Sequence, residues 1–433
     1  MYEKKAEELF DYTVKNRRKL HENPEISAKE EQTVAFVVDR LREMSIDFVE
    51  VNKGGVLAFI EGKKKSDNPK NLILRADLDG LPISESEENL GKKREVISKN
   101  TGVMHACGHD GHTAMLLSAG KIFKEIREDF SGKIILCFER GEEAALCAKY
   151  LFAYLDKNNI DIDSSFAIHV SPEYETGLLA IKAGGVNAGP MLFDVTIKGE
   201  AGHGSRPYLA NNPLDCFVDI YEGLKSMRMN NFSPFDPITY SIGVVEMGKQ
   251  FNQIPERLTF KGSARFFDRT NVGYKFYRDF KSLIINKARA NGCRVRFNSF
   301  TRPHFPIVND EKLADLAKEA IGQELGEEFV VKANPSMGSD SFAAYTAMWP
   351  GIYIMLGIRN EEKGTGAALH SNKFDLDEDA LKNGIRAIVS YSVAYLNSDI
   401  VLEGGPYKNN LRALFREEDR SDAEIEDIYN SII

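Results

Sequence analysis

Three of the eight histidines in this chain fall within residues 105–112, which read His-Ala-Cys-Gly-His-Asp-Gly-His. Cys107 and His109 in this stretch are two positions apart across a glycine, so their thiolate and imidazole can bind the same metal ion. The same pattern also describes the start of a helix that Asp110 caps and whose histidines are solvated. The stretch alone leaves both interpretations open.

A pair of adjacent carboxylates, Glu142 and Glu143, follows directly after the apolar segment 133–138. Adjacent carboxylates are most often solvated surface groups. In open α/β sheets, however, ligands bind outside the carboxyl ends of the strands. At such a place one carboxylate can bind a metal ion while its neighbour stays free as a base.

Two separate histidines complete the set of possible metal donors. His169 lies close to the end of the apolar segment 166–170, and His370 lies in a loop before a long helical pattern. Each histidine alone is more simply explained as a core or loop residue. Together, four segments deliver donors to strand ends or loops, and such a set suits two ions about 3.5–4 Å apart that share a ligand. The donors are Cys107, His109, Glu143, His169 and His370.

The elements that position these donors alternate between helix and strand. The first 45 residues are predicted to be helical, because Val34, Val37, Val38 and Leu41 recur on one helix face. We predict strands at 48–51, 56–60, 72–76, 133–138, 166–170 and 352–357, and helices at 113–128, 144–155, 311–325 and 377–396. This alternation indicates an α/β sheet with much parallel pairing.

The middle third of the chain has a different order of elements. We predict a strand, helix, strand, strand, helix and strand at 193–198, 213–227, 239–245, 258–267, 274–290 and 294–298. That order is typical of a small α+β sandwich inserted into a larger domain. We therefore divide the chain into a catalytic domain, residues 1–186 and 302–433, and an inserted lid, residues 187–301. The tail after Glu403 is polar and mostly helical in propensity.

The composition excludes several classes of protein. Lys plus Arg is 56 and Asp plus Glu is 65, so the net charge of −9 gives no basic patch for a nucleic acid. The apolar runs are strand-sized, well short of the ~18–20 residues that span a bilayer. The charged amino terminus predicts a helix and no signal peptide, and five cysteines make a disulfide framework unexpected. We expect a soluble cytoplasmic enzyme.

Several further stretches match motifs of one known family and occur in the same order along the chain. They are Arg-Ala-Asp-Leu-Asp-Gly-Leu-Pro at 75–82, Met104 to His112, Gly-Glu-Glu-Ala at 141–144, Gly-His-Gly-Ser at 202–205, Asn-Gln-Ile-Pro at 252–255, Met-Gly-Ser at 337–339 and Leu-His-Ser at 369–371. On these residues the chain resembles the M20 metallopeptidase/amidohydrolase family. The resemblance is to the branch of hippurate hydrolases, indole-acetyl-amino-acid hydrolases and N-acetyl-diaminopimelate deacetylases. It covers nearly the whole chain.

The resemblance implies a mixed-sheet, dinuclear-metal catalytic domain with an inserted ferredoxin-like lid that forms a homodimer. It makes the five donors the ligands of two divalent ions, Glu142 the general base and Asp79 a carboxylate behind the metal centre. Asp79 is equally explained as a turn residue. The resemblance places His203, otherwise a plain surface residue, over the partner subunit's metal centre, as a donor to the oxyanion. The single thiolate favours zinc, with manganese, cobalt and nickel still open.

The chain departs from the family's usual pattern at three places. Residues 139–141 are Glu-Arg-Gly where the family usually has Gln-Pro-Ala. Residues 340–341, after Met-Gly-Ser, are Asp-Ser where the family usually has Glu-Asp. The polar tail beyond Leu396 is longer than usual. None of these departures removes a ligand, so they bear on the substrate and leave the reaction unchanged.

The expected reaction is hydrolysis of the amide bond in a small N-acyl or N-aminoacyl amino acid. Glu142 would take a proton from water and pass it to the leaving nitrogen. Asn252 and Arg265 are candidate partners for a substrate carboxylate, although Arg265 is equally explained as a solvated strand residue. A dipeptidase is the alternative within the enzyme class. A binding protein with a structural metal site is the alternative outside it, but structural sites are usually closed and have no spare carboxylate such as Glu142.

Overall fold

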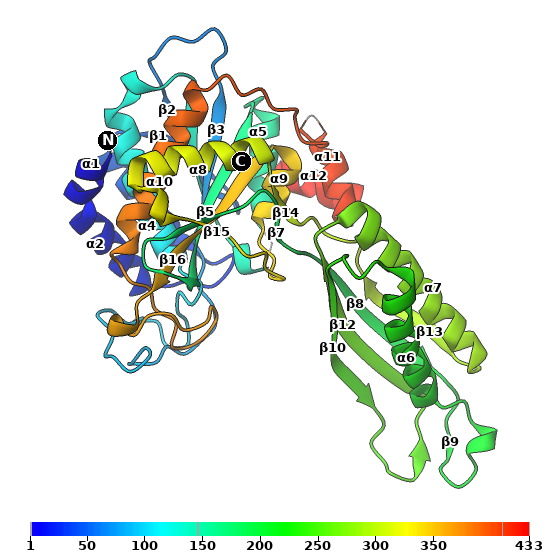
Figure 1. Ribbon diagram of the computed structural model, residues 1–433. Coiled ribbons are helices and arrows are strands. Elements are labelled where there is room, and N and C mark those ends of the chain that lie inside the picture. Colours follow the sequence, from blue (N-terminus) through cyan, green and yellow to red (C-terminus); the bar gives the residue numbers. More distant parts are fainter. Residues whose placement is uncertain (1, 145–146, 409, 433) are drawn as a thin grey trace.

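The computed structural model describes residues 2–144, 147–408 and 410–432. The described chain forms two bodies (Figure 1). The large body is built on an eight-stranded sheet. The narrow body is built on a four-stranded sheet and projects from one side of the large body.

The strands of the large sheet lie in the order β1-β2-β4-β3-β5-β16-β6-β15. Their bounds are β1 Asp47–Val51, β2 Gly55–Glu61, β3 Asn71–Asp77, β4 Lys133–Glu139, β5 Ser164–Glu175, β6 Leu179–Ile181, β15 Val330–Lys332 and β16 Gly351–Arg359. β3 is parallel to β4 and β5, and β16 is parallel to β5. β2 is antiparallel to β1 and β4. The sheet is therefore mixed, which confirms the predicted α/β class.

Helices cover both faces of this sheet because its central strands are apolar along their length. Residues 72–76 of β3 are all buried, and its apolar side chains point alternately into two separate cores. The first core lies under α1 Glu3–Glu8, α3 Glu31–Glu43, α4 His109–Glu125, α8 Glu311–Leu325 and α10 Ala380–Asn397, and α2 Phe10–His21 packs against α4. The second lies under α5 Ala148–Lys157, α9 Phe342–Met348, α11 Leu411–Glu417 and α12 Asp422–Ser431. The polar tail thus contributes two helices to the second core.

The narrow body has the element order that the sequence pattern predicts. Its elements are β8 Gly189–Lys198, α6 Pro213–Asn231, β10 Ile238–Met247, β12 Arg257–Phe266, α7 Tyr274–Ala290 and β13 Arg294–Phe300. The strands are antiparallel in the order β10-β12-β8-β13, which is the ferredoxin-like arrangement. A third core, rich in phenylalanine, joins the sheet to α6 and α7.

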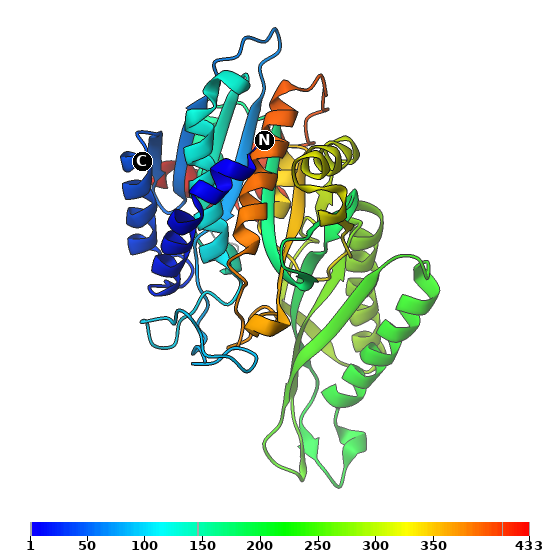
Figure 2. The ribbon, with the colours of Figure 1, turned by 60° about the vertical axis from the view of Figure 1, so that its left-hand side comes forward.

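A short strand pair lies at the far end of the narrow body, away from the large sheet (Figure 2). It consists of β9 Gly202–His203 and β11 Gln253–Ile254, in which His203 faces Gln253. At the opposite end, β7 Gly184–Asn187 and β14 Ile307–Asn309 pair with each other. The two chain segments that lead into and out of the narrow body therefore lie side by side.

Several predicted boundaries differ from the structure, and three of these differences lie next to the predicted donors. The predicted helix 113–128 is α4, which begins at His109 because the turn before it is set by Gly108, with a left-handed φ of 84°. The predicted strand 166–170 continues as β5 to Glu175, so His169 lies in the middle of a strand. The predicted helix 144–155 is α5 and begins at Ala148. Residues 145 and 146 of that prediction lie outside the described residues.

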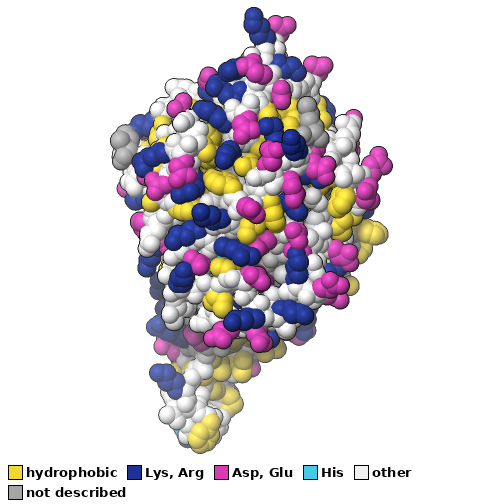
Figure 3. All heavy atoms as spheres, turned by 90° about the vertical axis from the view of Figure 1, so that its left-hand side faces the viewer, with side chains coloured by type: hydrophobic (Ala, Val, Ile, Leu, Met, Phe, Trp, Pro, Cys, Tyr) yellow, Lys and Arg dark blue, Asp and Glu magenta, His cyan; other side chains and the backbone are white. Residues whose placement is uncertain are grey.

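The charged side chains of the surface and the character of the helices complete the description of the fold. On the face of the large body shown in Figure 3, basic and acidic side chains are interspersed, so no basic patch gathers there. Of the helices within the described ranges, none combines the length and apolar character that a membrane span requires.

Candidate metal centre

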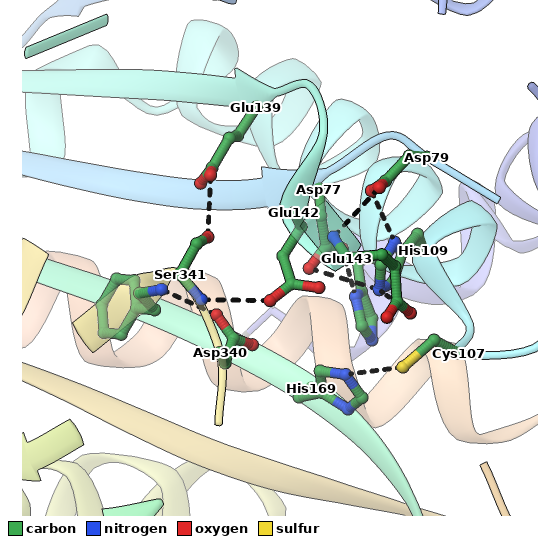
Figure 4. Close-up of polar contacts among 12 residues, drawn as sticks. Asp77, Asp79, Cys107, His109, Glu139, Glu142, Glu143, His169, Asp340 and Ser341 are labelled. Carbon is green, nitrogen blue, oxygen red and sulfur yellow. Dashed lines mark hydrogen bonds and ion pairs between the residues drawn. The ribbon is translucent and has the colours of Figure 1, made fainter. Parts of the chain in front are cut away.

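The predicted metal donors meet beyond the carboxyl ends of β3 and β4 and beside the middle of β5 (Figure 4). Cys107 and His109 are placed there by the turn at Gly108. A Cβ atom on Gly108 would lie 2.3 Å from the Cγ2 atom of Val170, in addition to requiring the left-handed φ. Only glycine fits this position, so the close packing of the turn on β5 fixes both donors.

Cys107 and His169 face each other. The Sγ atom of Cys107 lies 3.5 Å from Nε2 of His169. The other ring nitrogen of His169, Nδ1, donates to the carbonyl oxygen of Val170 at 2.7 Å, which leaves the Nε2 lone pair directed at the sulfur. Burial lowers the pKa of His169 to about 3, so its imidazole is neutral, as a metal ligand must be. Burial also raises the pKa of the Cys107 thiol.

His109 and Glu143 each present a buried atom that lacks a hydrogen bond. His109 donates from Nδ1 to Oδ1 of Asp79 at 3.1 Å, whereas its Nε2 atom has no hydrogen-bond partner. The Oε1 atom of Glu143, also without a hydrogen bond, lies 3.9 Å from that Nε2 atom. Buried polar atoms are rarely left unpartnered. A lone pair on nitrogen and a carboxylate oxygen that face one another fit a bound metal ion.

Asp79 holds these two donors from behind. Its Oδ1 atom accepts from His109, and its Oδ2 atom accepts from Ser27 Oγ at 2.6 Å and from the backbone N–H of Glu143 at 3.1 Å. Burial raises the pKa of Asp79, but the bonds from His109 and Ser27 outweigh it and leave the pKa below its usual value. The side chain is fully enclosed, so its role exceeds that of a turn residue.

His370 reaches the same cluster from the loop before α10. Its Nε2 atom lies 3.2 Å from Oε1 of Glu143, and its backbone N–H donates to the carbonyl oxygen of Ala106 at 2.8 Å. Within the described chain, four groups of possible metal donors have their ligand atoms within 4.8 Å of one another, and two of these groups join His109 to Asp77 and His112, and to Glu142 and Glu143. The other two contain only predicted donors: Cys107 with His109 and His169, and Cys107 with Glu143 and His370. Cys107 belongs to both groups. This sharing matches the expectation of two ions with a common ligand.

Glu142 lies beside the donors and is held by a different contact. Its Oε1 atom accepts from the backbone N–H of Ser341 at 3.0 Å (Figure 4). Within the described chain its Oε2 atom has no hydrogen bond. Burial and the nearby Asp340 carboxylate raise the pKa of Glu142. One oxygen is therefore fixed by the protein while the other has no hydrogen bond to the described residues.

The motif lies at the start of a helix, α4, as the alternative expected, but the predicted cap by Asp110 and the predicted solvation of its histidines are wrong. The turn residue before α4 is Gly108, and Asp110 makes no capping hydrogen bond. Asp110 instead pairs through Oδ2 with Nε of Arg17 and Nδ1 of His21, both at 2.8 Å. All three side chains are buried, as are the histidines of the motif.

Sequence reasoning missed a second set of residues behind the donors. His112 donates from Nδ1 to Oδ1 of Asp77 at 2.6 Å and accepts at Nε2 from the N–H of Val170 at 2.9 Å. Both of its nitrogens are therefore occupied, and it joins α4 to β5. Asp77 also accepts from Nη1 of Arg75 at 2.6 Å and lies 3.6 Å from Nε2 of His109. The available signal was Asp77 itself, two residues before Asp79 at the end of a strand.

The predicted residues of the narrow body lie in two places. Arg265 lies at the base of the narrow body, where it is half-buried. Its Nη1 atom donates to Oγ of Ser339 at 2.9 Å, next to the loop that holds Glu142. His203 and Asn252 lie at the far tip, where both are exposed. There the Nδ1 atom of His203 contacts only Ser205, at 2.8 Å. Neither tip residue belongs to the donor cluster of its own chain.

Comparison with protein families and curated proteins gives consistent matches. Residues 73–393 match the model of the family described as peptidase family M20/M25/M40. The chain is 33% identical to thermostable carboxypeptidase 2 of Saccharolobus solfataricus, over 90% of this chain and 97% of that protein. It is 33% identical to the IAA-amino acid hydrolase ILR1-like 2 of Arabidopsis thaliana, over 90% and 87%. It is 32% identical to the N-acetylcysteine deacetylase of Bacillus subtilis, over 84% and 92%.

Solved structures with the same architecture support this result. A putative aminohydrolase from methicillin-resistant Staphylococcus aureus superimposes with a TM-score of 0.81 at 25% identity, covering 91% of this chain and 99% of that one. The YXEP protein of Bacillus subtilis, a dinuclear metal binding peptidase from the M20 family, superimposes with a TM-score of 0.74 at 26% identity, covering 90% and 99%.

Proposed function

This chain belongs to peptidase family M20/M25/M40 and is a metal-dependent hydrolase of amide bonds, and on that premise we propose that it cleaves small N-acyl or N-aminoacyl amino acids. The observation that carries the proposal is that two adjacent carboxylates make different contacts. Glu143 faces His109 and His370, whereas Glu142, which also lies within 4.8 Å of His109 and Glu143, is held through one oxygen by the backbone N–H of Ser341. Two relatives, the IAA-amino acid hydrolase and the N-acetylcysteine deacetylase, have names that point to amino-acid conjugates.

We assign the five clustered donors to two divalent ions. When bound, such ions polarise a carbonyl group and bring the pKa of water close to neutrality. The single thiolate favours zinc, and manganese, cobalt and nickel are compatible with the same donor set. The ligands are Cys107, His109, Glu143, His169 and His370.

Glu142 is the general base in this proposal. Its Oε2 atom takes a proton from the attacking water and delivers it to the nitrogen of the leaving amino acid. The hydrogen bond from Ser341 to Oε1 keeps the carboxylate in one orientation while the proton moves. Asp79 holds His109 and Glu143 in position by accepting a hydrogen bond from each of them.

We further propose that residues 187–301 form a lid through which two chains make a homodimer. Of the fourteen large apolar side chains that are exposed in the described chain, eleven lie in this segment. Its edge strand β10 is unpaired on one side and carries two of them, Val245 and Met247. An unpaired strand edge with apolar neighbours is typical of an interface.

A dimer of this kind would divide substrate recognition between two chains. Arg265, next to Ser339 of its own chain, would bind the substrate carboxylate in its own site. His203 and Asn252 would reach the site of the partner chain, where Asn252 also contacts the carboxylate and His203 donates to the oxyanion. Their exposed place at the tip, beyond reach of their own donor cluster, supports this assignment.

A dipeptidase is the second candidate, because a carboxypeptidase is among the similar proteins. A binding protein with a structural metal does not fit the free carboxylate of Glu142 beside the donors. Both candidates can be tested by loading the purified protein with zinc, manganese, cobalt or nickel and offering N-acetyl, N-benzoyl and aminoacyl derivatives of the same amino acids. We expect the acyl derivatives to be cleaved fastest. Faster cleavage of the aminoacyl series would favour the dipeptidase, and cleavage of none would contradict the proposed function.

A further inference from the structure

Behind Glu142 lies a buried network of charges centred on Arg75. The side chain of Arg75 is 2% exposed. It donates from Nη1 to Asp77, from Nε to Oε2 of Glu139 at 2.8 Å and from Nη2 to Oγ of Ser341 at 2.7 Å. A fourth contact, at 3.4 Å, joins Nη1 to Oδ1 of Asp340. One cation thus joins the ends of β3 and β4 to the turn before α9.

Ser341 links this network to Glu142. Its hydroxyl oxygen accepts from Arg75 and donates to Oε1 of Glu139 at 2.7 Å, so both hydrogen-bonding functions of the hydroxyl are satisfied. Its backbone N–H donates to Glu142 (Figure 4). The orientation of Glu142 therefore depends on where the turn holds the amide of Ser341.

The turn is fixed on its other side by Asp340. The Oδ1 atom of Asp340 accepts from the N–H of Phe342, and its Oδ2 atom accepts from the hydroxyl of Tyr353, both at 2.7 Å. These bonds shape the turn and attach it to β16. The contact between Glu139 and Ser341 is the one that attaches the turn to the end of β4, the strand that leads into Glu142.

Positions 139 and 341 are also two of the places where this chain departs from the family's usual residues. This chain has a carboxylate at position 139 and a hydroxyl at position 341. The resemblance gives the family an amide at the first position and a carboxylate at the second. The two positions are separated by 202 residues in sequence, yet their side chains touch. Because both side chains contact Arg75, exchanging the pair for a glutamine and an aspartate would move one carboxylate from one partner of Arg75 to the other and keep the number of acidic groups around the guanidinium the same.

We infer that Glu139 and Ser341 are a coupled pair of positioning residues that sets the orientation of Glu142. This inference rests on the proposed function, because it takes Glu142 to be the base. An aspartate at position 341 would place two carboxylates in contact in a buried site, which is costly unless residue 139 is neutral. A glutamine at position 139 would leave Arg75 with one acidic partner fewer. Either single change should therefore disturb the turn, whereas the two changes together should restore it.

The test compares Glu139→Gln, Ser341→Asp and the double variant, each loaded with metal. We expect Glu139→Gln to lower kcat about 10-fold and Ser341→Asp to lower it about 100-fold, with KM and metal content close to wild type. The double variant should return to within about 3-fold of the wild-type kcat. A higher KM or a lower metal content, with kcat unchanged, would point to a general structural role and would overturn the inference.

A matched control removes a different buried carboxylate. Asp377 is enclosed and bound by Lys363, Asn360 and Thr176, which belong to neither the donor cluster nor the Arg75 network. Asp377→Asn should not rescue Ser341→Asp. If Ser341→Asp alone does not fold, comparison of Glu139→Gln with the double variant still decides. A double variant less active than Glu139→Gln contradicts the coupling, and one more active supports it.

Thermal unfolding separates a failure of this inference from a failure of the proposed function. If the wild type cleaves no amide substrate, the proposed function fails. The coupling is then measured by the midpoint temperature of unfolding. The double variant should regain at least half of the midpoint decrease that either single variant shows. If the wild type is active and the losses in kcat and in unfolding midpoint simply add, the inference alone is wrong.

Discussion

The metal centre and the tip of the lid use histidine in opposite ways. At the metal centre, His109 and His169 are buried, and the Nδ1 atom of each is oriented by a hydrogen bond, to Asp79 and to the carbonyl of Val170. At the tip, His203 is exposed, and among the described residues its imidazole hydrogen-bonds only to its neighbour Ser205. The first region is organised by one chain. The second has a polar residue on a projecting pair of strands, with no part of the donor cluster near it among the described residues of its own chain, which is why we propose that it acts on another chain.

The largest expected effect comes from removing the proposed base at the self-contained region. Glu142→Gln should lower kcat by about 10²–10⁴-fold, because general base catalysis is lost. Metal content should stay at the wild-type value, since Glu142 is not among the proposed ligands. Steady-state kinetics and metal analysis measure both quantities. The exposed Glu50, changed to Gln, is the control. Unchanged turnover in Glu142→Gln would remove Glu142 from the mechanism.

The next effect tests whether the tip acts across the dimer. His203→Ala alone should lower turnover by about 10²–10³-fold. When it is refolded with an equal amount of Glu142→Ala, half of the dimers are mixed and each has one intact site, so roughly a quarter of wild-type activity should return. In a control mixture of His203→Ala with Asn252→Ala, every site lacks one tip residue and activity should stay low. No recovery in the first mixture would mean that His203 acts within its own chain or not at all.

A third prediction compares two buried cysteines that differ in their neighbours. Cys107→Ser should lower the bound metal by about half or more, since its sulfur belongs to both donor groups. Cys137 is completely buried in β4, where its sulfur contacts the hydroxyl of Tyr345 at 3.3 Å, so Cys137→Ser should keep its metal. Metal analysis after dialysis distinguishes them. Equal losses would exclude Cys107 from the ligand set.

A fourth prediction concerns the carboxylate behind the ligands. Asp79→Asn should weaken metal binding by about 10–100-fold. The new side-chain amide would hold the His109 ring and the backbone N–H of Glu143 less well than the carboxylate does. Titration with a chelator of known affinity measures the change. Wild-type affinity in this variant would show that His109 and Glu143 are held without it.

The smallest expected effect concerns the tail. Glu417 of α11 accepts from Nη2 of Arg269 at 2.6 Å and from the hydroxyl of Tyr274 at 2.5 Å, both in the narrow body. Glu417→Gln should lower the free energy of unfolding by about 1 kcal/mol or less at neutral pH. Burial raises the pKa of Glu417, but the bonds from Tyr274 and Arg269 outweigh it and leave the pKa lowered. The contribution is therefore present above the usual glutamate pKa and is lost as the pH falls through the lowered value.

Unfolding measured at neutral pH and near pH 3 checks this prediction. The difference between Glu417→Gln and the wild type should shrink as the pH falls. A difference that grows in acid would mean that the carboxylate is not stabilised by these contacts.

The sequence predicts the donors better than it predicts what holds them. Cys107, His109 and the glutamate pair could be found because they lie in short motifs at strand ends. The links of Arg75 to Glu139 and Ser341 could not be found, because they join segments far apart in the chain and depend on side-chain geometry. For the same reason, two departures from the family pattern look unrelated in the sequence and are in contact in the fold.

The fold was predicted to a similar extent. The order of helices and strands in residues 189–300 matches the predicted pattern, since period and turn residues define such short elements well. The two tail helices were not placed, although Leu414 and Ile425 are completely buried, because their apolar residues have partners only in distant segments. His169 lies within a longer strand than its apolar segment indicated.

The order of strands in the large sheet also determines when this protein can finish folding during synthesis. β16 lies between β5 and β6, although it is the last strand to be made. The six main elements of the narrow body are contiguous in the chain and pair only among themselves, so they can fold as soon as they emerge. The large sheet must wait with an open centre until residues 351–359 arrive. Because His370 follows this last strand, a ribosome-bound chain has a complete narrow body before it has a complete set of metal donors.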